Sequence, residues 1–121
     1  MSSAEHDRRI DYIEFSVTSV AEAKRFYGNV FGWSFEDYGP DYASFADGRL
    51  TGGFQTAAVK SGGPLVVIYA ADLESLEQRV RQAGGSVVRP IFSFPGGRRF
   101  HFTDPSGNEL AVWSDKKKRE G

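Results

Sequence analysis

The sequence predicts an α+β fold made of two tandem βαβββ modules. Together the modules are expected to form a curved, mostly antiparallel sheet, shaped as a cup, with both helices on its outer face. The first observation is that the hydrophobic pattern changes from the strand period of two to the helical period of 3.6 and back again. The second is that the same order of elements repeats after residue 64, in segments of about 55 residues each. Neither segment alone can bury one face of its own sheet, so the two are expected to form a single domain over residues 9–114.

The first module, residues 9–59, begins with a strand and a helix. Apolar and polar residues alternate over 10–17, which is typical of a strand with one buried face. Apolar residues then recur at helical spacing over 19–31, where Ser19 and Glu22 have the form of a capping box. Turns containing glycine separate the three strands expected next, at 33–38, 42–46 and 51–59.

The second module, residues 65–114, repeats this order after a flexible linker over 60–64. Its helix is expected between Asp72, as the N-cap, and the glycine pair that follows Ala83. Its strands are expected at 65–70, 86–90, 97–104 and 108–114. Outside the modules, residues 1–8 are expected to be a disordered tail and 115–121 a solvated basic tail.

Composition excludes several classes of function. The net charge is −1 and the pI is about 6.1, whereas a nucleic-acid-binding protein usually carries a basic face. There is no cysteine, which excludes disulfides and thiolate chemistry. No apolar run approaches the roughly 20 residues that span a bilayer, and the polar N-terminus lacks a signal-peptide core. We therefore expect a cytoplasmic protein that binds neither nucleic acid nor membrane.

Three motifs mark the ends of the two helices and the start of the last strand. "FYGNVFGW" spans the end of the first helix, "QAGG" ends the second helix, and "DPSGN" precedes the last strand. In this order the motifs resemble the vicinal oxygen chelate superfamily, which includes glyoxalase I, extradiol dioxygenases, fosfomycin-resistance enzymes and bleomycin-resistance proteins. The resemblance covers residues 9–114. It implies that Phe26, Tyr27 and Phe31 attach the first helix to the sheet, whereas Trp33 either joins them or reaches the cleft.

In the enzymes of this superfamily, His and Glu side chains of the first and last strands of each half bind a divalent metal. The corresponding positions here hold Tyr12, Leu65 and Ala111, and the segment 48–71 contains no His, Asp, Glu or Cys. The resemblance therefore implies that the usual metal site is lost, and we expect no metal or other cofactor. An atypical metal site made of Glu14, His101 and Glu109 remains an alternative.

Strand alternation predicts which side chains face the cleft. Seven of them are the candidate ligand-binding residues: Tyr12, Glu14, Tyr69, Arg99, His101, Glu109 and Trp113. Aromatic faces beside a few polar groups suit a small, partly apolar organic ligand, and the rings can stack on a planar or cationic one. Arg98 or Arg99 can meet an anionic group on that ligand.

Each candidate also has a structural interpretation. Glu14 and Arg99 can form an ion pair across the cup, and the three aromatic candidates can fill it as core. His101 is the only catalytic candidate, because an imidazole exchanges protons near neutral pH and its position resembles a substrate-contacting position of the fosfomycin-resistance enzymes. The alternative is that His101 has a structural role only and forms hydrogen bonds with neighbouring strands.

Three hypotheses of function follow. The first is a metal-free protein that binds a small, partly aromatic organic ligand; it resembles the bleomycin-resistance branch and, like that branch, is expected to be a homodimer with a shared cleft. The second is an enzyme, a lyase, isomerase or dioxygenase, that either lacks a metal or has an atypical metal site. The third is a non-catalytic interaction or regulatory domain.

Overall fold

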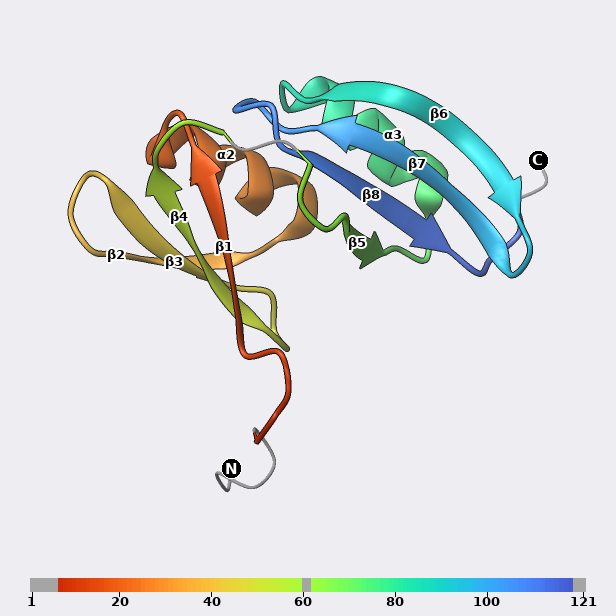
Figure 1. Cartoon of the computed structure of the whole chain (residues 1–121). Coiled ribbons are helices and arrows are strands. Elements are labelled where there is room, and N and C mark those ends of the chain that lie inside the picture. Colours follow the sequence, from red (N-terminus) through yellow and green to blue (C-terminus); the bar gives the residue numbers. More distant parts are fainter. Residues whose placement is uncertain (1–6, 60–61, 119–121) are drawn as a thin grey trace.

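The structure, a computed structural model, describes residues 7–59 and 62–118. It contains two four-stranded sheets, each with one helix packed against one face (Figure 1). The predicted α+β fold with two βαβββ modules is confirmed. Most of the predicted N-terminal tail, part of the predicted linker and the end of the predicted basic tail lie outside the described residues.

The two modules have the same topology. The first contains β1 (Tyr12–Val17), α2 (Val20–Phe31), β2 (Ser34–Asp37), β3 (Tyr42–Ala46) and β4 (Thr51–Thr56). The second contains β5 (Val66–Tyr69), α3 (Leu73–Gln82), β6 (Ser86–Phe94), β7 (Gly97–Thr103) and β8 (Glu109–Ser114). The strand orders are β1-β4-β3-β2 and β5-β8-β7-β6. In each sheet only the first pairing is parallel, so the sheets are mostly antiparallel and the internal duplication is confirmed.

The first helix begins and ends where the sequence predicts. The Ser19 side chain accepts a hydrogen bond from the backbone N–H of Glu22, 3.1 Å away. Gly32 ends the helix with φ of 73°, a left-handed conformation that glycine adopts without steric cost. These local signals position α2 before any long-range contact is considered.

The "FYGNVFGW" segment fastens α2 to the sheet. Phe26 and Tyr27 are fully buried. Trp33 stacks on Tyr27 at 4.7 Å and on Phe45 of β3 at 4.6 Å between ring centroids. The alternative in which Trp33 reaches the cleft is therefore wrong, because this ring packs among core aromatics between helix and sheet.

The strand β6 is longer than predicted. It runs from Ser86 to Phe94 instead of ending at residue 90, and it is the edge strand of its sheet. Its pairing with β7 shifts register between Val87 and Arg89 and again between Arg89 and Phe92. Pro90 lies at the second shift, where a missing backbone N–H is tolerated on an edge strand.

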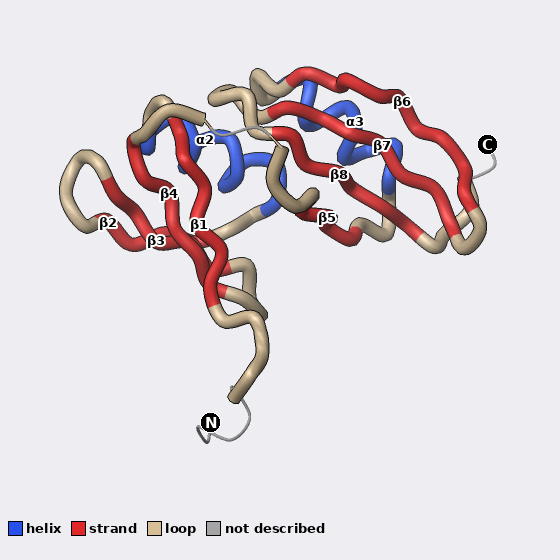
Figure 2. The backbone as a smooth tube through the Cα atoms, in the orientation of Figure 1, coloured by secondary structure: helices blue, strands red, loops and turns tan. Residues whose placement is uncertain are grey.

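We call the face of each sheet opposite its helix the inner face. Figure 2 shows the two sheets side by side, with the helices on the same side of both. The inner faces are therefore open in the single chain: Tyr12, Val67 and Tyr69 are 43–48% exposed. No helix among the described residues is long and apolar enough to cross a membrane.

Candidate functional site

The inner face of the second module is built from rows of side chains that cross all four strands. Strand register places Tyr69, Trp113, Arg99 and Phe92 in one row, from β5 through β8 and β7 to β6. The next row contains Val67, Ala111, His101 and Arg89. Glu109 lies on this face beyond the second row, opposite Thr103.

The structure brings together five of the seven predicted ligand-binding residues on this inner face. They are Tyr69, Arg99, His101, Glu109 and Trp113. The other two, Tyr12 and Glu14, lie on the inner face of the first module. Within one chain, the predicted residues therefore form two groups.

His101 and Glu109 form a polar pair on β7 and β8. His101 is only 8% exposed, and its Nδ1 lies 2.9 Å from Oε2 of Glu109. A carboxylate accepts only, so the pair places a proton on Nδ1. The Nε2 atom of His101 is buried and has no hydrogen-bond partner among the described residues. This nitrogen carries a lone pair in the neutral ring and a proton in the imidazolium, so it can accept or donate a proton.

Two guanidinium groups and an imidazole surround the Phe92 ring. The guanidinium carbons of Arg89 and Arg99 lie 3.6 Å and 5.4 Å from its centroid, and the His101 ring stacks on it at 5.9 Å. Arg99 also lies 5.7 Å from the Phe94 ring, and its Nε is buried without a partner in the described part of the chain. The sequence alone did not place Arg89, Phe92 and Phe94 in the site, although the alternation of Phe92 and Phe94 with Ser93 is a strand signal.

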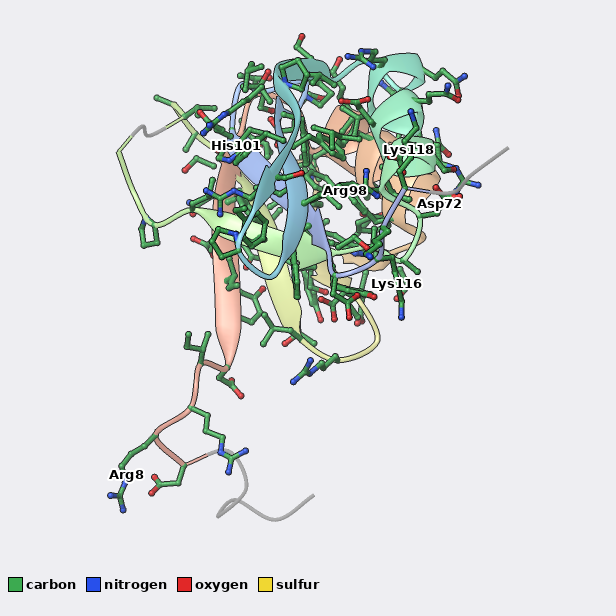
Figure 3. The ribbon with its side chains drawn as sticks, turned by 90° about the vertical axis from the view of Figure 1, so that its right-hand side faces the viewer. Arg8, Asp72, Arg98, His101, Lys116 and Lys118 are labelled. Atoms are coloured by element: carbon green, nitrogen blue, oxygen red, sulfur yellow. The ribbon has the colours of Figure 1, made fainter. Side chains whose placement is uncertain are left out.

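Arg98 faces the opposite side of β7 from Arg99. Its guanidinium donates hydrogen bonds to the carboxylate of Glu74 on α3 and to the carbonyl of Lys116. Figure 3 shows His101 on one side of the sheet, with Arg98 and Lys118 on the other. Of the two arginines that the sequence offered for an anionic group, only Arg99 lies on the inner face.

Aromatic rings extend the site toward β5. Tyr69 meets Trp113 edge-on at 5.4 Å, and Trp113 lies 6.5 Å from Phe94. The Tyr69 hydroxyl donates a 2.7 Å hydrogen bond to Asp115, which raises the pKa of Tyr69 and lowers that of Asp115. The predicted aromatic residues therefore remain partly exposed on a sheet surface and do not fill a closed core.

On the inner face of the first module, two tyrosine hydroxyls meet above a glycine. The Tyr12 and Tyr42 hydroxyl oxygens are 2.5 Å apart, and Tyr42 donates a 2.9 Å hydrogen bond to Glu14. Gly53 leaves the space that these hydroxyls occupy. Burial, followed by these hydrogen bonds, raises the pKa of Tyr42. The alternative of a Glu14–Arg99 ion pair is not formed among the described residues, where Glu14 instead accepts a hydrogen bond within its own module.

The residues present do not fit the metal site that the superfamily implies. Leu65 and Ala111 have hydrocarbon side chains and offer no donor atom to a cation. Among the described residues no three His, Cys, Asp or Glu side chains are grouped so that they could hold a metal ion. The alternative trio of Glu14, His101 and Glu109 is therefore not assembled within the chain.

Comparison with known proteins agrees with this architecture. Residues 9–112 match the model of the Glyoxalase/Bleomycin resistance protein/Dioxygenase superfamily, and the chain belongs to this superfamily. A Mycobacterium bovis protein named "Putative glyoxylase CFP32" is 26% identical over 115 residues, covering 85% of this chain and 44% of its own. The anthracycline biosynthesis protein DauV of Streptomyces sp. strain C5 is 30% identical over 124 residues, covering 84% of this chain and 45% of its own. The chain thus spans less than half the length of these curated relatives.

Solved structures share the fold. A glyoxalase-related enzyme from Fulvimarina pelagi superposes with a TM-score of 0.75 at 21% sequence identity, and the match covers 88% of each chain. At this identity the likeness supports the fold alone.

Proposed function

We propose that this protein binds a small, partly aromatic organic molecule on the inner face of its second module. The observation that carries the proposal is His101, which is buried against Phe92 and paired with Glu109 but keeps Nε2 without a partner among the described residues. Buried polar atoms of native proteins are nearly always hydrogen-bonded, so an unpaired one on an otherwise open sheet face supports a ligand-binding site there. The proposed place of action is the cytoplasm.

The rings around His101 suit the apolar part of such a ligand. Tyr69, Trp113, Phe94 and Phe92 form a nearly continuous series of aromatic side chains across the sheet. Flat rings gain apolar contact and stacking energy with planar ligands while losing little conformational entropy.

Binding is tested by a screen of planar aromatic compounds, with the His101 and Trp113 NMR resonances as reporters. We expect compounds that bind to shift both resonances. The substitution His101→Gln should lower the affinity of these compounds. Arg79→Gln, on the exposed outer surface of α3, is the control and should leave the affinity of the bound compounds unchanged. Hits that shift only resonances of other surfaces would contradict the proposal.

We further propose that binding needs no metal, because the positions of the superfamily's ligands carry Tyr12, Leu65 and Ala111. Metal analysis of the purified protein should find less than stoichiometric Zn²⁺, Ni²⁺, Mn²⁺ or Fe²⁺. None of these ions should raise the melting temperature, since a ligand stabilises a protein only if it binds the folded state preferentially. Stoichiometric metal would overturn this part of the proposal and favour a chelating enzyme.

A homodimer is the proposed assembly, with inner faces of two chains enclosing a shared cup. It is supported by apolar side chains left open on these faces in the single chain, at Tyr12, Leu65, Val67 and Tyr69. Sedimentation should give twice the chain mass, and Val67→Asp should lower it to that of one chain. A monomeric native protein that still binds the aromatic hits would refute the dimer and leave the binding proposal intact.

A second candidate function is metal-free proton transfer, as in an isomerase or lyase. The observation that favours it is the Glu109 carboxylate, which fixes the Nδ1 proton of His101 and leaves Nε2 free to act as a base. His101→Gln would then abolish turnover of a bound compound while much of its affinity remained. Unchanged chemical identity of every bound compound after long incubation would argue against catalysis.

A further inference from the structure

The inner face of the second module carries two arginines that pair with no carboxylate among the described residues. Arg89, Arg99 and His101 gather around one ring, that of Phe92. Among the described residues neither arginine has an ion-pair partner, and the one carboxylate bound to this group, that of Glu109, is paired with His101. A guanidinium that lies over a ring uses its flat face and leaves its N–H groups available to a ligand.

Two polar atoms of this cluster are buried without a partner in the described structure. They are Nε of Arg99 and Nε2 of His101. Both residues lie on the inner face of β7, two positions apart, so their backbones are separated by about 7 Å. A carboxylate or phosphonate accepts hydrogen bonds at two or more oxygens, so one such group can bind donors on both side chains.

The first module's inner face has the opposite character. It presents Glu14 and Glu36, which register places in one row with Gly53 and Ser44. An anion would be repelled there, whereas the arginines of the second module attract it. Charge therefore distinguishes the two faces and selects the second for an anionic group.

We infer that the ligand of the proposed binding site is a planar organic oxyanion, a carboxylate or phosphonate attached to an unsaturated ring. Its charged group lies between Arg99 and His101, where it accepts a hydrogen bond from Nε of Arg99 and, when the imidazole carries a second proton, from Nε2 of His101, and Arg89 adds charge at the rim. Its ring lies beside Phe92 and Trp113. This inference rests on the proposed function and names the chemical class of the ligand.

The test is a titration of the full chain, followed by NMR, with small benzene derivatives whose polar groups differ in charge. Benzoate and phenylphosphonate are the anionic probes, and benzamide and benzylamine are the neutral and cationic ones. We expect the anions alone to shift the side-chain Nε–H resonance of Arg99 and the ring nitrogens of His101. Fragments of this size bind with dissociation constants on the order of 1 mM, so titration to about 20 mM is decisive.

Variants assign the contact. Arg99→Gln should lower the affinity for the anions about tenfold or more. Arg99→Lys should restore part of the affinity, because it keeps the charge but not the Nε donor. Arg79→Gln makes the same charge change on α3, away from the inner face, and should have no effect.

The outcomes separate this inference from the proposed function. If benzamide binds as tightly as benzoate and still requires His101, the binding site stands and the anionic class is wrong. If Arg99→Gln changes the sedimentation coefficient but not anion affinity, a partner chain's carboxylates balance the arginines and the inference is again wrong. If no probe of any charge shifts the inner-face resonances, both the inference and the binding proposal fail.

Discussion

Tyr27 and Asp104, 77 residues apart, join the two modules through a buried hydrogen bond of 2.9 Å from the tyrosine hydroxyl to the carboxylate. Asp104 also accepts from the backbone N–H groups of Ser106 and Asn108. The Asn108 side chain in turn donates to the Ser16 carbonyl of β1, 2.8 Å away. The "DPSGN" turn therefore fastens the second module to the helix and first strand of the first. Burial, with the neighbouring carboxylate, raises the pKa of Tyr27 well above its usual range.

Tyr27→Phe is expected to lower the free energy of unfolding by about 2 kcal/mol, because it removes a buried hydrogen bond to a charged acceptor. Urea denaturation measures this change. Tyr38→Phe removes a hydroxyl from an exposed tyrosine of the same module and should change stability by no more than about 0.5 kcal/mol. Equal effects of the two variants would mean that the buried bond contributes nothing specific.

Asn108→Ala removes the link from the turn to β1 and is expected to cost about 1 kcal/mol. Both this side chain and the Tyr27 hydroxyl bind the Asp104 carboxylate, so the two substitutions should not be additive in the double variant. A double-mutant cycle measured by urea denaturation gives the coupling energy. Strict additivity would show that the two bonds act independently and that the turn is not one unit.

Local signals account for the parts of the fold that the sequence predicts well. Ser19 and Gly32 set the limits of α2 through contacts within a few residues, and a spacing of 3.6 identifies its buried side. The inward positions of Arg99, His101 and Glu109 follow from alternation along regular strands in the same way. Such patterns hold wherever the strand is regular.

The residues that sequence reasoning missed lie where regularity fails. Arg89 and Phe92 are three positions apart, so alternation places them on opposite faces of β6. In the structure they pair with His101 and Arg99 on the same face, because two residues of β6 oppose one of β7 between them. Only the long-range pairing with β7 reveals this bulge.

Two adjacent glycines of β4 should respond differently to the same substitution. A methyl group on Gly52 would overlap the backbone carbonyl of Ile13 and the Phe45 ring in the core, whereas one on Gly53 would overlap the ends of the Tyr12 and Tyr42 side chains. Tyrosine hydroxyls can move aside, but a strand backbone cannot.

We therefore expect Gly52→Ala to cost about 3 kcal/mol and Gly53→Ala about 1 kcal/mol or less. Urea denaturation of both variants gives the comparison, and the Tyr42 ring resonances report the displaced hydroxyl in Gly53→Ala. A larger loss for Gly53→Ala would show that the tyrosine pair is rigid and matters more to stability than the core contact.

The ion pair between Glu74 and Arg98 should make stability depend on pH in the acid range. The hydrogen bond from Arg98 is the main cause that lowers the pKa of Glu74 below its ordinary value of 4.5. A carboxylate with a lowered pKa in the folded state stabilises the protein above the unfolded pKa, and this contribution is lost as the pH falls through the folded one. The free energy of unfolding should therefore decrease between about pH 5 and pH 3, and Glu74→Gln should reduce that slope. Arg98→Gln removes the same pair from the other side and should reduce the slope equally; a slope unchanged in both variants would show that other carboxylates cause the acid sensitivity.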